Sequence, residues 1–218
     1  MSLISHIAKF FQDGGHFMIP IALVAVIGIA IAIERYLYLT WARSRNQSLW
    51  KQLEPLLGAG NFRGAAELAS RSLSAVGQIL TYGLARIQGA KRRDDVEKAM
   101  EESLMGIVPR LEKRTHYLAT FANLATLLGL LGTVMGLIQA FSAVATVNPA
   151  EKANLLSASI SEAMNCTAFG LMVAVPLLII HAVLQTKTTE LIDSLEMASV
   201  KFLNSIVERR PEGAAVSA

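Results

Sequence analysis

The sequence predicts an all-α integral membrane protein with three transmembrane helices and long cytoplasmic helical extensions. Three apolar stretches support this prediction, because a helix needs about 20 apolar residues to cross a bilayer. The chain of 218 residues is 53% hydrophobic with a mean hydropathy of +0.44, which is too apolar for an ordinary soluble domain. The net charge of only +3 does not favour nucleic acid as a partner, and a lone cysteine, Cys166, permits no disulfide within one chain.

The first transmembrane helix is predicted over residues 17–41, after a short interfacial segment at residues 1–16. It has neither the basic start nor the small-residue cleavage site of a signal peptide. Glu34 and Arg35 mark its inner end, and Glu34 is interpreted as an interfacial ion-pair partner, with an ion site as the alternative. Aromatic residues suited to an interfacial belt follow, namely Tyr36, Tyr38 and Trp41.

Residues 42–115 are predicted to form a cytoplasmic helical region. Between Arg43 and Arg114 there are 13 Lys and Arg against 8 Asp and Glu, and such enrichment beside membrane helices marks the cytoplasmic side. We expect an amphipathic helix from residue 62 to residue 86, and a basic turn at residues 91–93. Two aspartates at residues 94 and 95 then cap a helix that can run unbroken into the second span.

The remaining chain continues the pattern of spans and cytoplasmic helices, which places the N-terminus in the periplasm and the C-terminus in the cytoplasm. The predicted elements are the second span at residues 116–145, a short periplasmic loop at 146–158, the third span at 159–186, an amphipathic cytoplasmic helix at 187–210 and a disordered tail at 211–218.

Small residues form a narrow stripe on each of the second and third spans, at about 3.6 residues per turn. The stripe of the second span contains Ala122, Thr126, Gly129, Thr133, Gly136 and Ala140, with Gly132 beside it. The stripe of the third span contains Ala163, Thr167, Gly170 and Ala174. One interpretation is that these are packing faces whose hydroxyls bond to carbonyls of their own helix. The other is that they line an ion pathway or a groove for a partner helix.

Two segments resemble known motifs of the MotA/TolQ/ExbB proton channel family. Residues 128–137, LGLLGTVMGL, resemble the motif of the family's second span, and residues 161–176, SEAMNCTAFGLMVAVP, resemble that of its third. Three spans with one large insert after the first resemble the ExbB/TolQ branch. The chain departs from the family pattern at Thr126, where proline is common, and at Asn165 and Cys166, which replace an aliphatic residue and an alanine.

The resemblance implies a homo-oligomeric ring of five subunits around a dimer of single-span partner helices of the ExbD/TolR type. Ions would cross the inner membrane by way of an aspartate on the partner. By position, Thr133 and Thr167 match the family's pore threonines and Glu162 matches its third-span glutamate. A protein of the TonB/TolA type or of a gliding machinery would receive the work.

The positions of the charged residues independently favour a partner that supplies an acid. With span centres near Leu131 and Met172, Glu162 lies about 15 Å from the centre at 1.5 Å per residue. No carboxylate of this chain is therefore expected at mid-membrane, where a proton relay needs an ionisable group. Glu162 is either an interfacial or N-terminal helix residue favoured by the helix dipole, or it has an ion-entrance or interfacial ion-pair role. His181 either lines an inner vestibule or belongs to the interfacial belt.

We therefore predict the ion-conducting stator subunit of an inner-membrane motor, embedded in the lipid bilayer and driving work on the cell envelope. Protons are the expected ion, and a sodium-driven version and a non-conducting scaffold are the alternatives. An enzyme is not expected, because the sequence has no metal-spaced cluster, nucleophile motif or phosphate loop. No cofactor is expected either.

Overall fold

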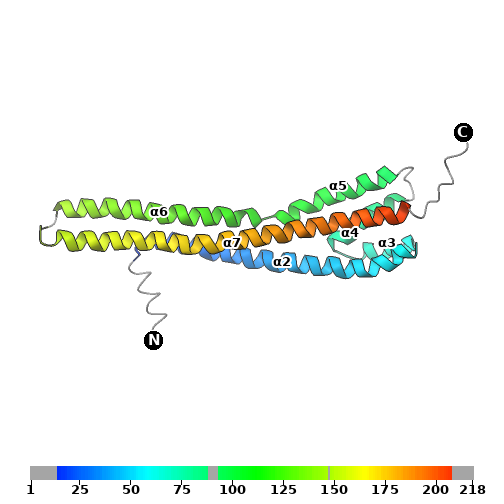
Figure 1. Cartoon of the computed structure of the whole chain (residues 1–218), viewed down its shortest axis with the longest axis horizontal. Coiled ribbons are helices and arrows are strands. Elements are labelled where there is room, and N and C mark those ends of the chain that lie inside the picture. Colours follow the sequence, from blue (N-terminus) through cyan, green and yellow to red (C-terminus); the bar gives the residue numbers. More distant parts are fainter. Residues whose placement is uncertain (1–13, 88–92, 147, 208–218) are drawn as a thin grey trace, which may run out of the picture. The chain divides into compact units, whose positions relative to one another are not determined.

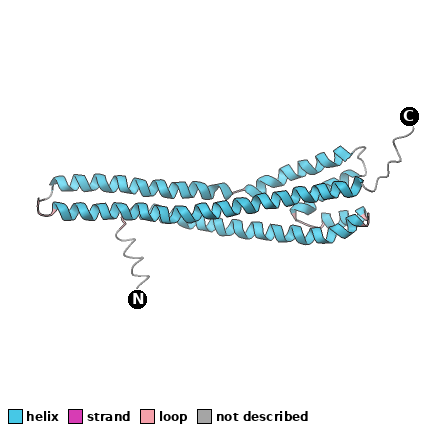
Figure 2. Ribbon diagram, in the orientation of Figure 1, coloured by secondary structure: helices cyan, strands magenta, loops and turns pink. Residues whose placement is uncertain are grey.

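The structure is a computed structural model that describes residues 14–87, 93–146 and 148–207, and this part of the chain contains helices and no strand (Figure 2). The all-α prediction is confirmed for these residues. The helices are α2 (Met18–Gly58), α3 (Phe62–Ser70), α4 (Ala75–Ile87), α5 (Arg93–Glu112), α6 (Thr115–Thr146) and α7 (Lys152–Val207) (Figure 1). The predicted interfacial segment up to residue 13, residues 91 and 92 of the basic turn and the predicted tail lie outside the described residues.

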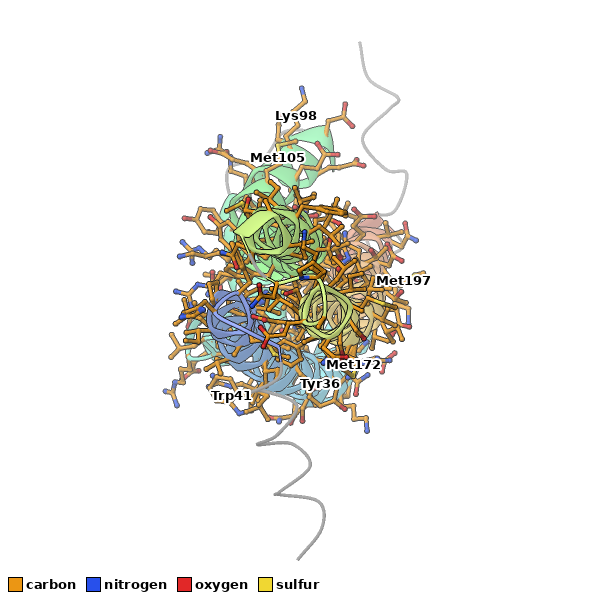
Figure 3. All side chains as sticks on the ribbon, turned by 90° about the vertical axis from the view of Figure 1, so that its left-hand side faces the viewer. Tyr36, Trp41, Lys98, Met105, Met172 and Met197 are labelled. Atoms are coloured by element: carbon orange, nitrogen blue, oxygen red, sulfur yellow. The ribbon has the colours of Figure 1, made fainter. Side chains whose placement is uncertain are left out.

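Three helical stretches, in α2, α6 and α7, are long and apolar enough to cross a membrane, as predicted. Between 17% and 33% of their most apolar windows is buried within the chain. Many large apolar side chains therefore point outward, such as Met172 of α7, which is 56% exposed (Figure 3). Such a surface suits lipid or other membrane helices, and it is much larger than the apolar patches of a soluble monomer.

The chain divides into two compact units, and the division falls inside α2 and α7. The first unit contains the chain through Arg35 together with Arg114–Leu184. The second contains Tyr36–Lys113 and the chain from Gln185 onward. Most of the three predicted spans belongs to the first unit, and the predicted cytoplasmic helices make up the second.

In the first unit, α6 and the first part of α7 run side by side (Figure 1). Buried residues recur every three or four positions on both helices, which is the period of a packed helix face. On α6 they are Leu118, Ala122, Ala125, Gly129, Gly132 and Ala140, and on α7 they are Ala163, Cys166, Gly170, Ala174, Leu177 and Leu184. We call this contact the α6–α7 seam. The start of α2 packs here too, since a Cβ on Gly28 would lie 2.9 Å from Leu177.

In the second unit, large apolar side chains from several helices form a conventional core. Phe202 of α7 and Met100 of α5 are almost fully buried. They fill the space beside Gly83 of α4, where a Cβ would lie 2.7 Å from Met100 and 3.0 Å from Phe202. This close packing holds α4, α5 and the end of α7 together.

The prediction of a single amphipathic helix from residue 62 to residue 86 is wrong, because the chain forms two helices there, α3 and α4. The break falls at residues 71–74, where side-chain oxygens take the place of backbone carbonyls as acceptors for the first N–H groups of α4. The Ser74 hydroxyl accepts the Gly77 N–H at 3.1 Å, and the Asn46 side-chain oxygen accepts the Val76 N–H at 3.3 Å. These side chains cap the first turn of α4 and so favour a new helix start.

The prediction of an unbroken helix from residue 96 into the second span is also wrong. It is interrupted between α5 and α6 at Arg114, which has a left-handed φ of 66°. A helix cannot continue through a residue in that conformation. The Arg114 guanidinium donates a hydrogen bond of 2.9 Å to the Glu34 carboxylate, which bears out the interpretation of Glu34 as an ion-pair partner.

The connection between α6 and α7 is shorter than expected. Helix α7 begins at Lys152, so residues 152–158 of the expected loop are helical. The turn before α7 is closed by a hydrogen bond from the Glu151 N–H to the Asn148 carbonyl, at 3.0 Å. The helix then runs through Pro176 to Val207 without interruption.

Candidate functional site

The α6–α7 seam depends on glycines, because α7 occupies the space where their side chains would be. A Cβ on Gly136 would lie 2.9 Å from the Cβ of Ala163, and one on Gly132 would overlap the sulfur of Cys166. Seen from α7, a Cβ on Gly170 would lie 2.7 Å from the Ala125 carbonyl oxygen. The two helix backbones therefore approach each other closely along this seam, as small residues permit in membranes.

All of the small residues that the sequence predicts for helix packing or a partner groove lie in or beside this seam. They are Gly129, Gly132, Gly136, Ala140, Ala163, Gly170 and Ala174. The contact that the structure shows for Gly129, Gly132, Gly136 and Gly170 joins two helices of one chain. Their small size is thus needed for the fold of the first unit itself.

A hydrogen bond crosses the seam at one of the predicted ion-path threonines. The Thr167 hydroxyl on α7 donates to the Gly129 carbonyl on α6 at 2.9 Å. A Cβ on Gly129 would lie 3.2 Å from the Thr167 Cα, so the glycine is what lets the threonine backbone come within reach. This bond fixes the position of the Thr167 oxygen between the two family-like motifs.

The other two threonines donate to carbonyls of their own helix. Thr133 bonds to the Leu130 carbonyl at 2.6 Å, and Thr126 bonds to the Ala122 carbonyl at 3.2 Å. Each threonine follows a buried seam residue in the sequence and so lies about 100° further around α6. Thr133 is half-buried and Thr126 is exposed. Both oxygens are therefore presented at the edge of the seam, with their lone pairs available to a neighbouring helix, ion or water.

Glu162 lies at a small pocket of about 110 Å³ in the first unit. Its walls include the turn of residues 14–17 before α2, Gln139 of α6 and Cys166 of α7. The Glu162 carboxylate lies directly against the backbone of Gly15. Glu162 and Cys166 stood out in the sequence, but this turn was not predicted, although the adjacent pair Gly14 and Gly15 was an available signal.

His181 is not part of this arrangement. It is half-buried on α7, 14 positions after Thr167, which separates the two residues by about 21 Å along the helix axis. Among the described residues, no group of three or more His, Cys, Asp or Glu could hold a metal ion.

A larger groove of about 660 Å³ lies in the second unit, between α5 and α7. Its lining includes apolar side chains such as Leu104 and Val200 and the carboxylates of Glu101 and Glu196. This groove was not predicted from the sequence, because it depends on how two helices distant in the sequence come together.

Comparison with known proteins identifies the class to which this arrangement belongs. Residues 71–197, which include α6 and the first part of α7, match the model of the MotA/TolQ/ExbB proton channel family. The chain therefore belongs to this family, as its motifs had suggested.

Several relatives place the chain near the ExbB and TolQ members. A protein of Synechocystis sp. described as ExbB-like in biopolymer transport is 31% identical, over 84% of this chain and 72% of the relative. An ExbB homologue of Methanothermobacter thermautotrophicus is 27% identical, over 88% and 67%. The Tol-Pal system protein TolQ of Pseudomonas aeruginosa is 34% identical over 40% of this chain and 38% of its own length. With its three candidate spans, the chain is a multi-pass membrane protein of a proton-channel family.

Proposed function

We propose that this chain is the ion-conducting stator subunit of an inner-membrane motor. Copies of it form a ring, with five subunits by the family resemblance, around a dimer of single-span partners of the ExbD/TolR type. Protons pass between Thr133 and Thr167 of the ring and an aspartate of the partner. The resulting motion acts on a TonB-like, TolA-like or gliding protein of the cell envelope.

The observation that carries this proposal is the hydrogen bond from Thr167 to the Gly129 carbonyl, because it joins the two family motifs at one point. Thr133 lies on α6 one helical turn after Gly129, at the edge of the same seam. Hydroxyls held in this way can relay a proton or orient water, but they cannot store a charge. Since this chain has no carboxylate near the middle of its second or third span, a partner must supply the titrating group.

The second unit faces the cytoplasm in this proposal. Its chain segment is rich in Lys and Arg, which favours the cytoplasmic side, and the turn between α6 and α7 then lies in the periplasm. Glu162 consequently lies on the periplasmic side of Thr167.

A sodium-driven version is the second candidate, and Thr126 is the observation that favours it. Thr126 adds a third hydroxyl to the path, beside Thr133 on α6 and Thr167 on α7, and Na⁺ as a hard cation prefers oxygen ligands. Thr126, Thr133 and Thr167 already donate to carbonyls, which leaves their oxygens able to coordinate a cation. We favour protons because the family to which the chain belongs is one of proton channels.

The test is the double variant Thr133→Val with Thr167→Val, expressed together with the partner protein. Valine keeps the shape of threonine and removes the hydroxyl, so we expect normal membrane levels and loss of motive-force-dependent function. Thr120→Val is a matched control, because Thr120 also bonds back to a carbonyl of α6, that of His116, but lies outside the stripe. Normal function of the double variant would refute the ion path and favour a scaffold.

A further inference from the structure

The turn before α2 makes an unusually close contact with Glu162. Gly15 has a φ of +72°, and a Cβ built on it would overlap a carboxylate oxygen of Glu162. The same Cβ would lie 3.0 Å from Glu162 Cδ and 3.3 Å from its Cγ. The end of the Glu162 side chain therefore rests on the backbone of Gly15, in the space that any other residue would fill with its own side chain.

The turn is held in place from two directions. The Met18 N–H donates to the Gly15 carbonyl at 3.2 Å, which ties the turn to the first residues of α2. On the other side, the Cβ of Phe17 lies 3.3 Å from the position of a Cβ on Gly132, so the turn also reaches the α6–α7 seam. The Met18 side chain is buried and occupies the space beside Gly14. The backbone that supports Glu162 is thus anchored to both α2 and α6.

We propose that the Gly14–Phe17 turn positions the carboxylate of Glu162 beside the α6–α7 seam, and that Gly15 is the positioning residue. A methyl group at Gly15 would meet the flexible end of a side chain rather than a backbone atom. The carboxylate would swing aside while the helices stay in place. The polar groups that share the pocket with it are His16 of the turn, Gln139 of α6 and Cys166 of α7.

This inference rests on the proposed function for the consequence of moving Glu162, but the contact itself does not. The contact is tested by a disulfide between Gly15→Cys and Glu162→Cys, in a Cys166→Ala background and in the full complex in membranes. We expect efficient cross-linking on mild oxidation. Gly15→Cys with Met164→Cys is the matched control. Met164 is exposed on α7, and its side chain is rotated by about 200° about the helix axis from that of Glu162, so it lies on nearly the opposite face. Equal yields for the two pairs would overturn the inference.

The functional consequence is tested with two glycine variants. Gly15→Ala should lower proton flux about ten-fold or more at normal membrane levels, since small displacements of a positioned group are costly. Gly60→Ala controls for backbone strain, because Gly60 has a similar φ of +73° far along the chain. This control should keep flux within about two-fold of the parent.

A positioning role also predicts rescue. In a Glu162→Asp background the carboxylate is one methylene shorter and clears a methyl group at residue 15. The double variant Gly15→Ala with Glu162→Asp should therefore have a flux within about two-fold of that of Glu162→Asp alone. If the two substitutions acted independently, their separate losses of flux would multiply in the double variant. Losses of flux that multiply would overturn the inference. If Gly15→Ala fails to accumulate in the membrane, the yield of the disulfide between residues 15 and 162 decides whether the contact exists. Full activity of Glu162→Gln would instead refute a role of Glu162 in the ion path, and the cross-link would still test the contact.

Discussion

The Thr167 hydroxyl reaches across the α6–α7 seam and bonds to the Gly129 carbonyl at 2.9 Å. This bond combines the two interpretations that the sequence left open. The small residues are packing residues, and the threonine among them holds its oxygen at a defined point of that packing. An ion path can therefore be as rigid as the helix pair that carries it, without a charged group of its own.

Removing this bond should affect function more than stability. Thr167→Val should destabilise the protein by only about 0.5–1.5 kcal/mol, the net value of one hydrogen bond. Proton flux should fall strongly, because the positioned oxygen is lost. Thr167→Ser, which keeps the hydroxyl, should retain most of the flux. A larger loss of flux in Thr167→Ser than in Thr167→Val would show that the methyl group, and hence packing, is what matters.

The seam predicts opposite outcomes for two helical glycines. Gly132→Ala should destabilise the protein by about 1–3 kcal/mol, because the new methyl overlaps the sulfur of Cys166. Gly106→Ala on α5 meets nothing within 4 Å and should be neutral or stabilising, since alanine is the better helix former. Thermal unfolding in detergent measures both.

The Gly132 prediction has its own rescue. Cys166→Ala removes the sulfur and should recover much of the stability lost in Gly132→Ala. A double variant no more stable than Gly132→Ala alone would place the conflict elsewhere.

The Glu34–Arg114 ion pair should contribute little to either stability or conduction. Both side chains are about half exposed, and exposed pairs contribute below about 1 kcal/mol. Glu34→Gln should therefore keep membrane levels and proton flux near the parent. A flux as low as that of Thr167→Val would instead place Glu34 in the ion path.

Membrane topology can be tested with single cysteines in a Cys166→Ala background. Lys152→Cys, at the start of α7, should react from outside intact spheroplasts with a membrane-impermeant maleimide. Arg71→Cys, between α3 and α4, should react only after the membrane is opened. The reverse pattern would invert the proposed orientation and place Glu162 on the cytoplasmic side.

The spans and the stripes of small residues were predictable because they follow from local rules. A bilayer demands long apolar helices, and the period of a helix puts Gly129, Gly136 and Gly170 on recognisable stripes. The family resemblance added an expected role in ion passage for Thr133 and Thr167, which the physics of the stripes alone left undecided.

The features that escaped prediction depend on single residues or on register between distant segments. The break at Arg114 comes from one left-handed residue that pairs with Glu34, and arginine carries no signal for that conformation. The fit of Cys166 against Gly132 needs the register of α6 against α7, which neither helix specifies alone. The contact of Gly15 with Glu162 likewise joins residues far apart in the chain.

Ion flux in proteoliposomes that contain this chain with its single-span partner tests the central claim most directly. A proton gradient and a sodium gradient are imposed separately, and uptake is measured for the parent and for Thr133→Val with Thr167→Val. We expect flux that follows the proton gradient, is unchanged by sodium and is lost in the double variant. Flux that follows sodium and survives a protonophore, or equal flux in parent and double variant, would contradict the proposed proton path.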